Sequence, residues 1–484
     1  MAAAMKGCVP EDLTEDQVSE LVLQAKDFVA ASGLIVRTKE DPNSGDTVNH
    51  GPVTLFPSPV PQHCFAMAQK VQCSFNLLMH KVAHDHAFLR ETLKHTIEVD
   101  DFARHWWDVY IKSYEEGISQ PVTLALNRSD YMLDCPGKEG DTKDMQIKQV
   151  EFNTMASSFG GLAVVVSKYH RYVLETSGQQ YVDKRVPSND AVKGLASGIV
   201  EAWNRYGNKK AAVIFLVSET ERNIYDQRHL EFAVRTADPQ IKVLRRSIQA
   251  VRKSGSLGSS KELIVDGHEV AVVYMRMCYS PGDFESEKDW DALLTIERSR
   301  AITCPSARYF LAGTKKVQQE LARPGVLERF VDSKETVDLL RSTFAGQFSL
   351  DQGKEGDENI QKAISDPQKF VLKPQREGGG NNTYGDEIRT RLQQIQSTSE
   401  RNAYILMERI VPPVITNYGI WANQGVVKSE MISELGIYGV LVGTADEIYQ
   451  NEQCGHLLRT KILGTNEGGV ATGFSCLDSP YLIE

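Results

Sequence analysis

The sequence contains no two cysteines at C-x-x-C spacing, although it has eight cysteines in all. This absence argues against a zinc ribbon and against a thioredoxin-type redox pair, both of which need closely spaced thiols. The cysteines are scattered over the whole chain, at Cys8, Cys64, Cys73, Cys135, Cys278, Cys304, Cys454 and Cys476. We therefore expect reduced thiols in a cytoplasmic protein.

Long apolar runs and basic segments are also missing. No window approaches the roughly 20 apolar residues that a membrane-spanning helix needs, and the N-terminal MAAAMKGCVPEDLTEDQ reaches acidic residues before any apolar core of a signal peptide could form. Lys and Arg number 54 against 64 Asp and Glu, a formal net charge of −10. We expect a soluble protein with neither a membrane nor nucleic acid as its partner.

The chain of 484 residues is long enough for two or three domains, and helix and strand patterns alternate along it. Thr14 begins a T-E-D-Q sequence typical of a capping box, and residues 62–84 have the apolar spacing of an amphipathic helix. Continuous apolar runs at 211–217 and 270–275 predict buried strands, with a helix at about 226–236 between them. These patterns indicate a mixed α/β or α+β fold.

Three histidines, His80, His84 and His86, lie near the end of the helix predicted for residues 62–84. His80 and His84 are one helical turn apart, so they would supply two ligands of a metal site. His86 would point to another face of a continuing helix, which leaves the set short of a third ligand. Solvated histidines at a helix end are therefore favoured.

The most informative stretch is residues 370–387, FVLKPQREGGGNNTYGDE, in which a β-rich run delivers Lys373 into three successive glycines. Glycines let backbone N–H groups approach phosphate oxygens, the lysine adds a point charge, and the neighbouring Glu377 can hold the magnesium that accompanies a nucleotide. A surface turn is the alternative explanation for the Gly and Asn residues. The order matches neither G-x-x-x-x-G-K-[ST] nor G-x-G-x-x-G. It is similar to ATP-grasp enzymes, in which two sheets close on ATP.

Two further segments carry polar residues at i, i+2 spacing. Residues 145–153 alternate as a strand, so Glu151 and Asn153 point to one face, and a carboxylate beside an amide oxygen suits Mg²⁺. A solvated polar face is the alternative. Arg459 and Lys461 have the same spacing in HLLRTKIL, so they place two positive charges on one face of a strand. This pair is the cationic counterpart of Glu151 and Asn153.

Other charged residues follow or interrupt apolar strands. Arg128 follows one such run, where it would meet a ligand's carboxylate or phosphate, or form a structural pair with an aspartate. The charged segment 218–223 follows the first buried strand, at the place where open α/β sheets bind ligands. Glu434 is the only charge in the apolar run 431–442 and needs a partner such as a ribose hydroxyl or a metal. Lys315 is expected at the start of a helix. It would be either a phosphate ligand or an ordinary surface lysine.

Several long sequence motifs are similar to the motifs of one protein family. In order they read LNRSDYM, EFNTMASSFGGL, ERNIYDQR, LAGTKKVQQELARPG, LKPQREGGGNN, ISELGIYG and LLRTK. Together they resemble eukaryotic glutathione synthetases, from TLFPSPVP at residue 54 to the C-terminal GGVATGF. The resemblance therefore covers nearly the whole chain.

The resemblance implies an α/β (α+β) fold with an ATP-grasp core, a glycine-rich lid and an inserted parallel α/β substrate-binding domain, in a homodimer. The corresponding division is 1–209 for N-terminal helices and part of the core, 210–313 for the inserted domain, and 314–484 for the remaining core and lid. The implied reaction joins glycine to γ-glutamylcysteine through an acyl phosphate, with ATP and Mg²⁺.

The resemblance also implies site residues. The metal ligands are Glu151, Asn153 and Glu377. The nucleotide site comprises Lys315, Lys373, Pro374, Gln375, Arg376, Glu377, Gly378, Gly379, Gly380, Asn381, Asn382, Tyr384, Met407, Glu408, Arg409, Ile410, Glu434, Lys461 and Glu467. The substrate contacts are Arg128, Met155, Ala156, Ser157, Ser158, Glu221, Arg222, Asn223, Gln227, Arg276, Tyr279, Arg459, Val470 and Ala471. The catalytic groups are Arg459, Lys461, Gly378 and Gly379.

The sequence departs from the family pattern in two places. Met277-Cys278 stands where the family usually has a small residue or Asp followed by Gly, so the chain would bend differently there. Thr472 stands where a second alanine is common, whereas relatives that use β-alanine have Leu-Pro at this place. Ala471-Thr472 is nearer the glycine-using form, which predicts glycine as the acceptor. The rivals are a ligase with another acceptor, such as β-alanine or serine, and a module that binds ATP without catalysis.

Overall fold

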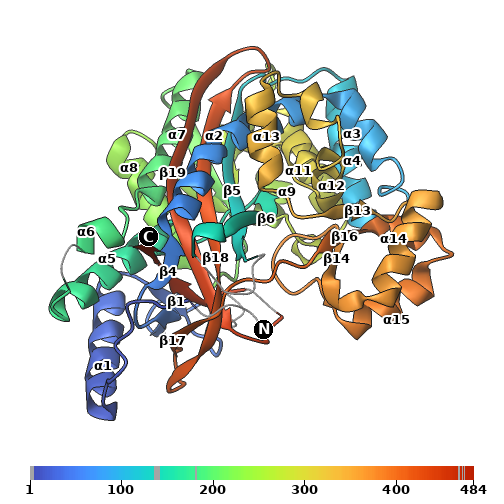
Figure 1. Cartoon of the computed structure of the whole chain (residues 1–484). Coiled ribbons are helices and arrows are strands. Elements are labelled where there is room, and N and C mark those ends of the chain that lie inside the picture. Colours follow the sequence, from blue (N-terminus) through green and yellow to red (C-terminus); the bar gives the residue numbers. More distant parts are fainter. Residues whose placement is uncertain (1–4, 136–141, 180–181, 467–468, 471–472, 474) are drawn as a thin grey trace.

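The computed structural model describes residues 5–135, 142–179, 182–466, 469–470, 473 and 475–484. In this part of the chain, three larger β-sheets and two small ones are covered by helices, so the fold is mixed α and β as expected (Figure 1). Among the described helices, none combines the length and the apolar character that crossing a bilayer would require. All eight cysteines are described, and each is a free thiol.

The largest sheet has seven strands in the order β17-β3-β20-β19-β18-β5-β6. Their bounds are β3 Val53–Thr54, β5 Thr123–Asp134, β6 Gln146–Asn153, β17 Ile415–Ile420, β18 Val426–Gly443, β19 Ile448–Ile462 and β20 Ser475–Asp478. The long hairpin β18–β19 forms its centre, closed by a turn in which the Thr444 N–H donates to the Glu447 carbonyl at 2.7 Å. Because β5 pairs with β18, segments about 300 positions apart in the sequence lie side by side.

Helices cover both faces of this sheet. Those that matter here are α2 Gln62–His84, α5 Gly160–Thr176 and α7 Ala191–Tyr206. A Cβ on Gly439 of β18 would lie 2.4 Å from Asn76 of α2, and a Cβ on Gly198 of α7 would lie 2.5 Å from Val440. Neighbouring residues of a strand face opposite sides. The two helices therefore pack closely on opposite faces, at positions where only glycine leaves room.

The second sheet has six strands, and α7 packs against it. Its elements are β7 Ala212–Leu216, α8 Ile224–Ala237, β8 Val243–Arg246, α9 Ile248–Ser254, β9 Ser256–Leu257, β10 Leu263–Val265, β11 His268–Met275, α10 Glu287–Arg298 and β12 Ile302–Cys304. Strands β8, β7, β11 and β12 run parallel, whereas β10 pairs antiparallel with β11 and β9. The sheet is thus mixed rather than wholly parallel, because a short hairpin extends one edge.

The third sheet is antiparallel, with the order β13-β16-β14-β15. Its elements are β13 Gln347–Ser349, α14 Lys354–Ser365, β14 Phe370–Pro374, β15 Thr383–Tyr384, α15 Asp386–Ile395 and β16 Tyr404–Glu408. Its two helices pack on it around a separate apolar core of Leu350, Ile360, Ala363, Leu372, Ile388, Leu392, Ile395 and Leu406. This core is separate from the cores of the other sheets, and the polar contacts described below join the small sheet to the large one.

The remaining elements complete the periphery. They are α1 Glu15–Ala31, β1 Ile35–Arg37, β2 Val48–His50, β4 Ser58–Pro61, α3 His86–Leu93, α4 Asp101–Glu115, α6 Val182–Arg185, α11 Ala307–Ala312, α12 Lys315–Leu321, α13 Lys334–Ser342 and β21 Pro480–Ile483. The capping box expected at Thr14 is confirmed, because its side chain accepts from the Gln17 N–H while the Gln17 side chain accepts from the Thr14 N–H. The helix predicted for residues 62–84 is confirmed as α2.

Of the three histidines near the end of α2, His80 is buried, and His84 and His86 are half-buried. His80 is buried, with one ring nitrogen 2.6 Å from the Tyr309 hydroxyl and the other 2.7 Å from the Thr444 carbonyl. Burial lowers the pKa of His80 to about 4. His84 Nδ1 donates to the His80 carbonyl at 2.7 Å. The interpretation of His80 as a solvated side chain is wrong, and its two ring contacts leave no nitrogen for a metal.

Candidate active site

One face of the large sheet collects the polar side chains that the sequence singled out. In the antiparallel pair β5–β6, Arg128 lies opposite Asn153 and Asp130 lies opposite Glu151. On the other side of β5, Gly436 of β18 lies opposite Asp130. The i, i+2 spacing expected to place Glu151 and Asn153 on one face therefore does so, in a cross-strand row that continues through β5.

The next strand pair extends this row. Glu434 of β18 lies opposite Arg459 of β19, and their side chains form an ion pair. Arg459 Nη2 also lies 3.1 Å from Asp130 Oδ2, across the intervening strand. Lys461 shares the face of Arg459 and donates to the Asn466 carbonyl at 3.1 Å. The partner that Glu434 requires in this apolar strand is thus an arginine of the same sheet.

Lys315, the first residue of α12, lies between two carboxylates. Its Nζ is 2.8 Å from Glu377 Oε1 and 3.2 Å from Glu151 Oε2. The residue is 5% exposed, so its interpretation as a surface lysine is wrong. Burial opposes the charge on Lys315, but the two carboxylates outweigh it and raise its pKa. The ammonium group joins the glycine-loop segment to the large sheet.

The two carboxylates differ in their electrostatics. Burial would raise the pKa of Glu151, but the positive charges of Lys315 and Lys373 outweigh it and lower the value to about 2. For Glu377, burial is the main effect and raises the pKa, with a further contribution from the charge of Glu151. The negative charge of Glu151 is therefore favoured by its surroundings, whereas burial disfavours the negative charge of Glu377. Carboxylates with perturbed pKa values are typical of a site that binds a cation.

Lys373 lies on β14 and reaches the large sheet. Its Nζ donates to the Val150 carbonyl of β6 at 2.7 Å, and the residue is 4% exposed. Burial is the main cause that lowers its pKa to about 8; Glu151 opposes this shift, and the charge of Lys315 adds to it. A second lysine thus joins the small sheet to the large one at the same place.

The glycine loop after β14 bends back over the large sheet. Gly378 and Gly380 have φ values of +79° and +95°, which residues with a side chain rarely adopt. A Cβ on Gly379 would lie 3.4 Å from the Gly469 nitrogen, and a Cβ on Gly378 would lie 4.0 Å from the Tyr279 ring. The loop therefore lies against the C-terminal glycine segment and the segment after β11, as a closed lid would.

Other residues of the predicted nucleotide set hold the loop in place. Gln375 Oε1 accepts from the Lys316 N–H at 3.0 Å, and Arg376 Nη1 lies 2.5 Å from Asp100 Oδ2 at the N-terminus of α4. Arg376 thus ties the start of the loop to a neighbouring helix. The remaining members lie on β14, β15, β16 or the segments that follow them, at Pro374, Asn381, Asn382, Tyr384, Met407, Glu408, Arg409 and Ile410.

A buried cluster joins the end of β11 to the start of α5. Arg276 Nη2 donates to Ser158 Oγ at 2.8 Å and lies 3.2 Å from Asp226 Oδ2. The same aspartate accepts from the N–H groups of Phe159 at 2.8 Å and Gly161 at 3.0 Å. The predicted loop before α5 is buried or half-buried beside this cluster and consists of Met155, Ala156, Ser157 and Ser158.

The predicted substrate residues after β7 separate into two groups. Gln227 Nε2 donates to Glu221 Oε2 at 2.8 Å, and the Asn223 N–H donates to Glu221 Oε1 at 2.7 Å. Arg222 is engaged elsewhere, because its Nε donates to the Arg37 carbonyl of β1 at 3.2 Å. Arg222 thus points toward the N-terminal hairpin formed by β1 and β2, whereas Glu221, Asn223 and Gln227 contact one another.

At Met277-Cys278, where the sequence departs from the family pattern, the backbone still has a bend of the kind that glycine adopts. Cys278 has a φ of +74°, in the left-handed region that costs a non-glycine residue about 1–2 kcal/mol. Arg276 and Tyr279 thus remain on either side of a turn that glycine would adopt freely. Val470 is buried. The predicted Glu467 and Ala471, and the departure at Thr472, lie outside the described residues.

The residues fit a divalent cation by the chemistry of their donors. Glu151 and Glu377 already share a cationic group, and Asn153 presents an amide beside them. No group of three or more His, Cys, Asp or Glu side chains suited to a metal occurs in the described part of the chain. Two carboxylates and one amide suit Mg²⁺, which takes few protein ligands and keeps water or phosphate oxygens in its other positions.

Sequence reasoning missed Gly436 and Asp226. By contrast, the structural pair with an aspartate that it offered for Arg128 is present, with Arg128 Nε 2.6 Å from Asp130 Oδ1. Asp130 follows Arg128 at i+2 spacing, the same signal that singled out Glu151 and Asn153, but its role depends on which strands flank β5. Gly436 gives no local signal, because its role depends on the side chains opposite it. Asp226 is the first residue of the helix predicted for residues 226–236, and only the fold brings it to the first turn of α5.

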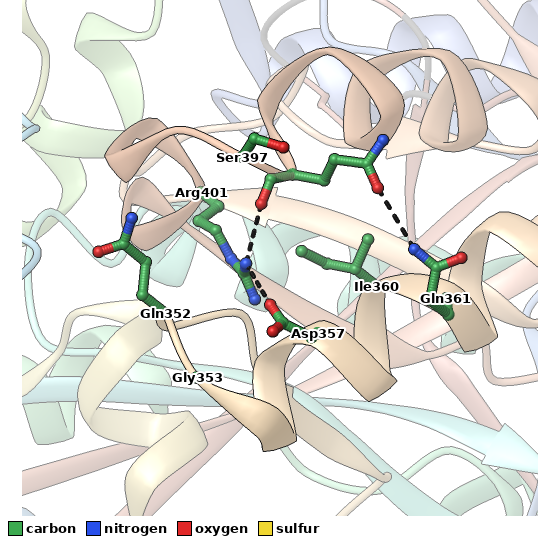
Figure 2. A pocket seen from close by; sticks show the side chains of 8 residues that line it. Gln352, Gly353, Asp357, Ile360, Gln361, Ser397 and Arg401 are labelled. Atoms are coloured by element: carbon green, nitrogen blue, oxygen red, sulfur yellow. Dashed lines mark hydrogen bonds and ion pairs between the residues drawn. The ribbon is translucent and has the colours of Figure 1, made fainter.

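The pocket in Figure 2 lies outside this site, in the small-sheet region (about 430 Å³). In it, Arg401 Nη1 donates to Asp357 Oδ1 at 2.6 Å and to the Gln396 carbonyl at 2.9 Å. None of the lining residues belongs to the predicted set. The arginine's contacts explain it as a structural link between the helices of the small sheet.

An ATP-binding family matches nearly the whole chain. The family model described as the eukaryotic glutathione synthase, ATP binding domain, matches residues 15–482. This match makes the chain an ATP-dependent ligase. The chain belongs to the eukaryotic glutathione synthase family.

Curated relatives match this chain over most of their length. The glutathione synthetase of Xenopus laevis is 45% identical over 467 residues, covering 96% of this chain and 97% of that protein. The human enzyme is also 45% identical, with the same coverage. The chloroplastic glutathione synthetase of Arabidopsis thaliana is 42% identical, covering 98% of this chain and 87% of that protein. A glutathione synthetase-like effector of Globodera pallida, solved in its apo form, has the same fold, with a TM-score of 0.78 at 24% identity over 99% of this chain and all of that one.

Proposed function

We propose that the protein joins glycine to the cysteinyl carboxylate of γ-glutamylcysteine, converting ATP to ADP and phosphate and forming glutathione. The observation that carries this proposal is the ion pair through which Lys315 joins Glu377, at the start of the glycine loop, to Glu151 on the sheet face that also carries Asn153. Arg459 and Lys461 extend that face with two positive charges. The arrangement brings together what phosphoryl transfer to a carboxylate requires.

The reaction would proceed in two balanced steps. The γ-phosphoryl group passes from ATP to the cysteinyl carboxylate, and ADP is released. The glycine nitrogen then attacks the acyl carbon; the C–N bond forms as the C–O bond to the phosphate breaks, and the surplus protons of the amine pass to phosphate and solvent. Neither step needs a nucleophilic side chain, so the rate depends on positioning and charge.

The roles of the residues follow from their places. Glu151, Asn153 and Glu377 would hold Mg²⁺, which neutralises phosphate charge when it is bound. Lys315 and Lys373 would contact the phosphates from the side of the small sheet. Arg459 and Lys461 would stabilise the charge that develops on the transferred phosphoryl group and on the tetrahedral oxygen.

The two sheets would close on the nucleotide in an ATP-grasp arrangement. Here the glycine loop excludes water, because an acyl phosphate exposed to solvent hydrolyses unproductively. The region of residues 210–313 would hold γ-glutamylcysteine through Arg276, together with Ser158 and Arg128 of the region 1–209. The core and lid would be shared between residues 1–209 and 314–484.

An acceptor assay tests the proposed reaction. With Mg-ATP and γ-glutamylcysteine, we expect ADP release that depends on glycine, with one glutathione formed per ADP. We expect little release with β-alanine, with serine or without acceptor. A preference for β-alanine or serine would keep the mechanism and overturn the acceptor. ATP binding without turnover under every condition would leave the non-catalytic module as the explanation.

The low pKa of Lys373 predicts how ATP use depends on pH. Because Lys373 loses its proton above about pH 8, kcat/KM for ATP should fall there by about tenfold per pH unit. Unfolding of this site would not explain the fall, since a lysine whose pKa is lowered on folding makes the folded state more stable as pH rises between about 8 and 10.4. Lys373→Arg keeps the charge and should remove the fall; an identical fall in that variant would contradict the assignment.

We further propose that the enzyme is a cytoplasmic homodimer. The free state of all eight cysteines supports a reducing compartment. The plant relatives are named as chloroplastic, so fractionation of the source cells distinguishes the two compartments. Sedimentation at micromolar concentration, which reports the mass in solution, tests the dimer.

A further inference from the structure

We propose that Asp130 is a positioning residue of this site, a role that rests on the proposed function. Its carboxylate is 0% exposed and lies at the centre of the cross-strand row, between β6 and β18. It touches three of the predicted site residues without lying among the predicted ligands. Through these contacts, one buried charge sets the orientation of the metal ligand Asn153 and of two arginines.

The contact with Arg128 is bidentate. Arg128 Nε lies 2.6 Å from Asp130 Oδ1, and Arg128 Nη2 lies 2.8 Å from Oδ2. Two parallel N–H···O bonds fix the plane of the guanidinium group. With that plane fixed, Nη1 donates to the Ser158 carbonyl at 3.1 Å. Arg128 is thereby aimed at the loop before α5, where the dipeptide substrate would lie.

The contact with Asn153 decides which amide atom faces the metal position. Asn153 Nδ2 donates to Asp130 Oδ2 at 2.9 Å and to the Arg128 carbonyl at 3.3 Å. Both partners are acceptors only, so the nitrogen of the amide must face them. The amide oxygen consequently faces away from Asp130, and an oxygen is the atom that a hard cation binds.

The contact with Arg459 balances charge. Arg459 Nη2 lies 3.1 Å from Asp130 Oδ2, so one carboxylate stands between this guanidinium group and that of Arg128. Without it, two cations would face each other in a buried region, and the attraction of Glu434 alone would hold Arg459. Asp130 thus keeps Arg459, which would act in the reaction, next to Arg128, which would bind the substrate.

Gly436 of β18 supplies the space for this arrangement. A Cβ on Gly436 would lie 2.7 Å from Asp130 Oδ1 and 2.8 Å from Arg128 Cδ, closer than real Cβ contacts. A methyl group there must displace the Arg128–Asp130 pair. Gly436→Ala is therefore a second way to disturb the pair, one that leaves every charge in place.

The test compares Asp130→Asn with Gly436→Ala and with Asp134→Asn, a control at the far end of the same strand. We expect the Mg²⁺ concentration for half-maximal glutathione formation to rise about 10- to 100-fold in the first two variants, the range seen when a partner that orients a metal ligand is removed. Binding of Mn²⁺ in the presence of ADP, followed by electron paramagnetic resonance, should weaken by a similar factor. The control should match the wild type in both.

A purely structural role predicts a different result. Asp130→Asn would then melt at a lower temperature, while the folded protein kept wild-type Mg²⁺ and Mn²⁺ dependence, and this outcome would overturn the proposal. If Asp130→Asn does not fold, Gly436→Ala gives the same comparison. Failure of the proposed function is read separately, from a wild-type protein that forms no glutathione; the Mn²⁺ comparison still decides the role of Asp130 in that case.

Discussion

Replacing Glu377 with alanine is expected to lower kcat for glutathione formation by about 10²- to 10³-fold, the loss typical when one preorganised electrostatic group is removed from an active site. Glu377 is the acceptor for Lys315 Nζ at 2.8 Å and one of two carboxylates at the proposed metal position. Its removal leaves Lys315 to pair with Glu151 alone. The cation site would then retain one carboxylate and one amide.

The fold should survive this substitution. Burial and the charge of Glu151 raise the pKa of Glu377, so the folded protein carries this charge at a cost. A raised carboxylate pKa means that the folded state binds more protons than the unfolded chain. The free energy of unfolding therefore falls as pH rises from the ordinary glutamate pKa through the raised pKa of Glu377. At neutral pH, Glu377→Ala should therefore melt at the same temperature as the wild type or higher.

The measurements are kcat at saturating substrates and a thermal melt at pH 7.5. The matched control is Glu387→Ala, an exposed glutamate on α15 in the same small-sheet region, which should behave as the wild type. A folded Glu377→Ala protein with near-normal turnover would remove Glu377 from the metal site. A large drop in melting temperature would instead show that its main contribution is to the fold.

Gly379→Val is expected to uncouple ATP use from glutathione formation. The Cβ of the new residue would lie 3.4 Å from the Gly469 nitrogen, and the two further carbons of valine must extend beyond it. The loop then cannot lie against the C-terminal glycine segment. A misplacement of about 1 Å in a closing element can cost about 10²-fold in rate. We expect a loss of that size in glutathione formation.

The ratio of ADP to glutathione identifies the cause. An open loop admits water to the acyl phosphate, so ADP should exceed glutathione in Gly379→Val, whereas the wild type should give a ratio near one. Gly425→Val is the control, because Gly425 lies in an exposed turn with nothing within 4 Å of its Cβ position. Reduced glutathione with an unchanged ratio would mean that the loop positions substrates without excluding water.

Much of the local structure could be predicted from the sequence. The helix at residues 62–84 and the capping box at Thr14 were identified because their signals lie within a few neighbouring residues. The shared face of Glu151 and Asn153, like that of Arg459 and Lys461, followed from the strand period of two. Assigning these residues to one site depended on their resemblance to a family.

The contacts within the site could not be predicted in this way. The sequence favours a surface lysine at position 315, yet Lys315 is buried between Glu151 of β6 and Glu377 of the segment after β14. His80 was expected to be solvated, yet its ring meets Tyr309, 229 positions away. Arg222 was grouped with its neighbours, yet its side chain is held by the N-terminal hairpin. In each case the partner comes from a distant part of the chain.

By itself, the sequence determined the capping box at Thr14, the helix at residues 62–84 and the positions of the glycine loop and of the i, i+2 pairs, because these depend on neighbouring residues. Only the tertiary structure decided that β5 lies between β6 and β18. That strand order places Asp130 beside Asn153 and Arg459, and it requires a glycine at 436. The physical reason is that strand order and register are set by packing over the whole sheet, and a side chain's role follows from the strands that become its neighbours.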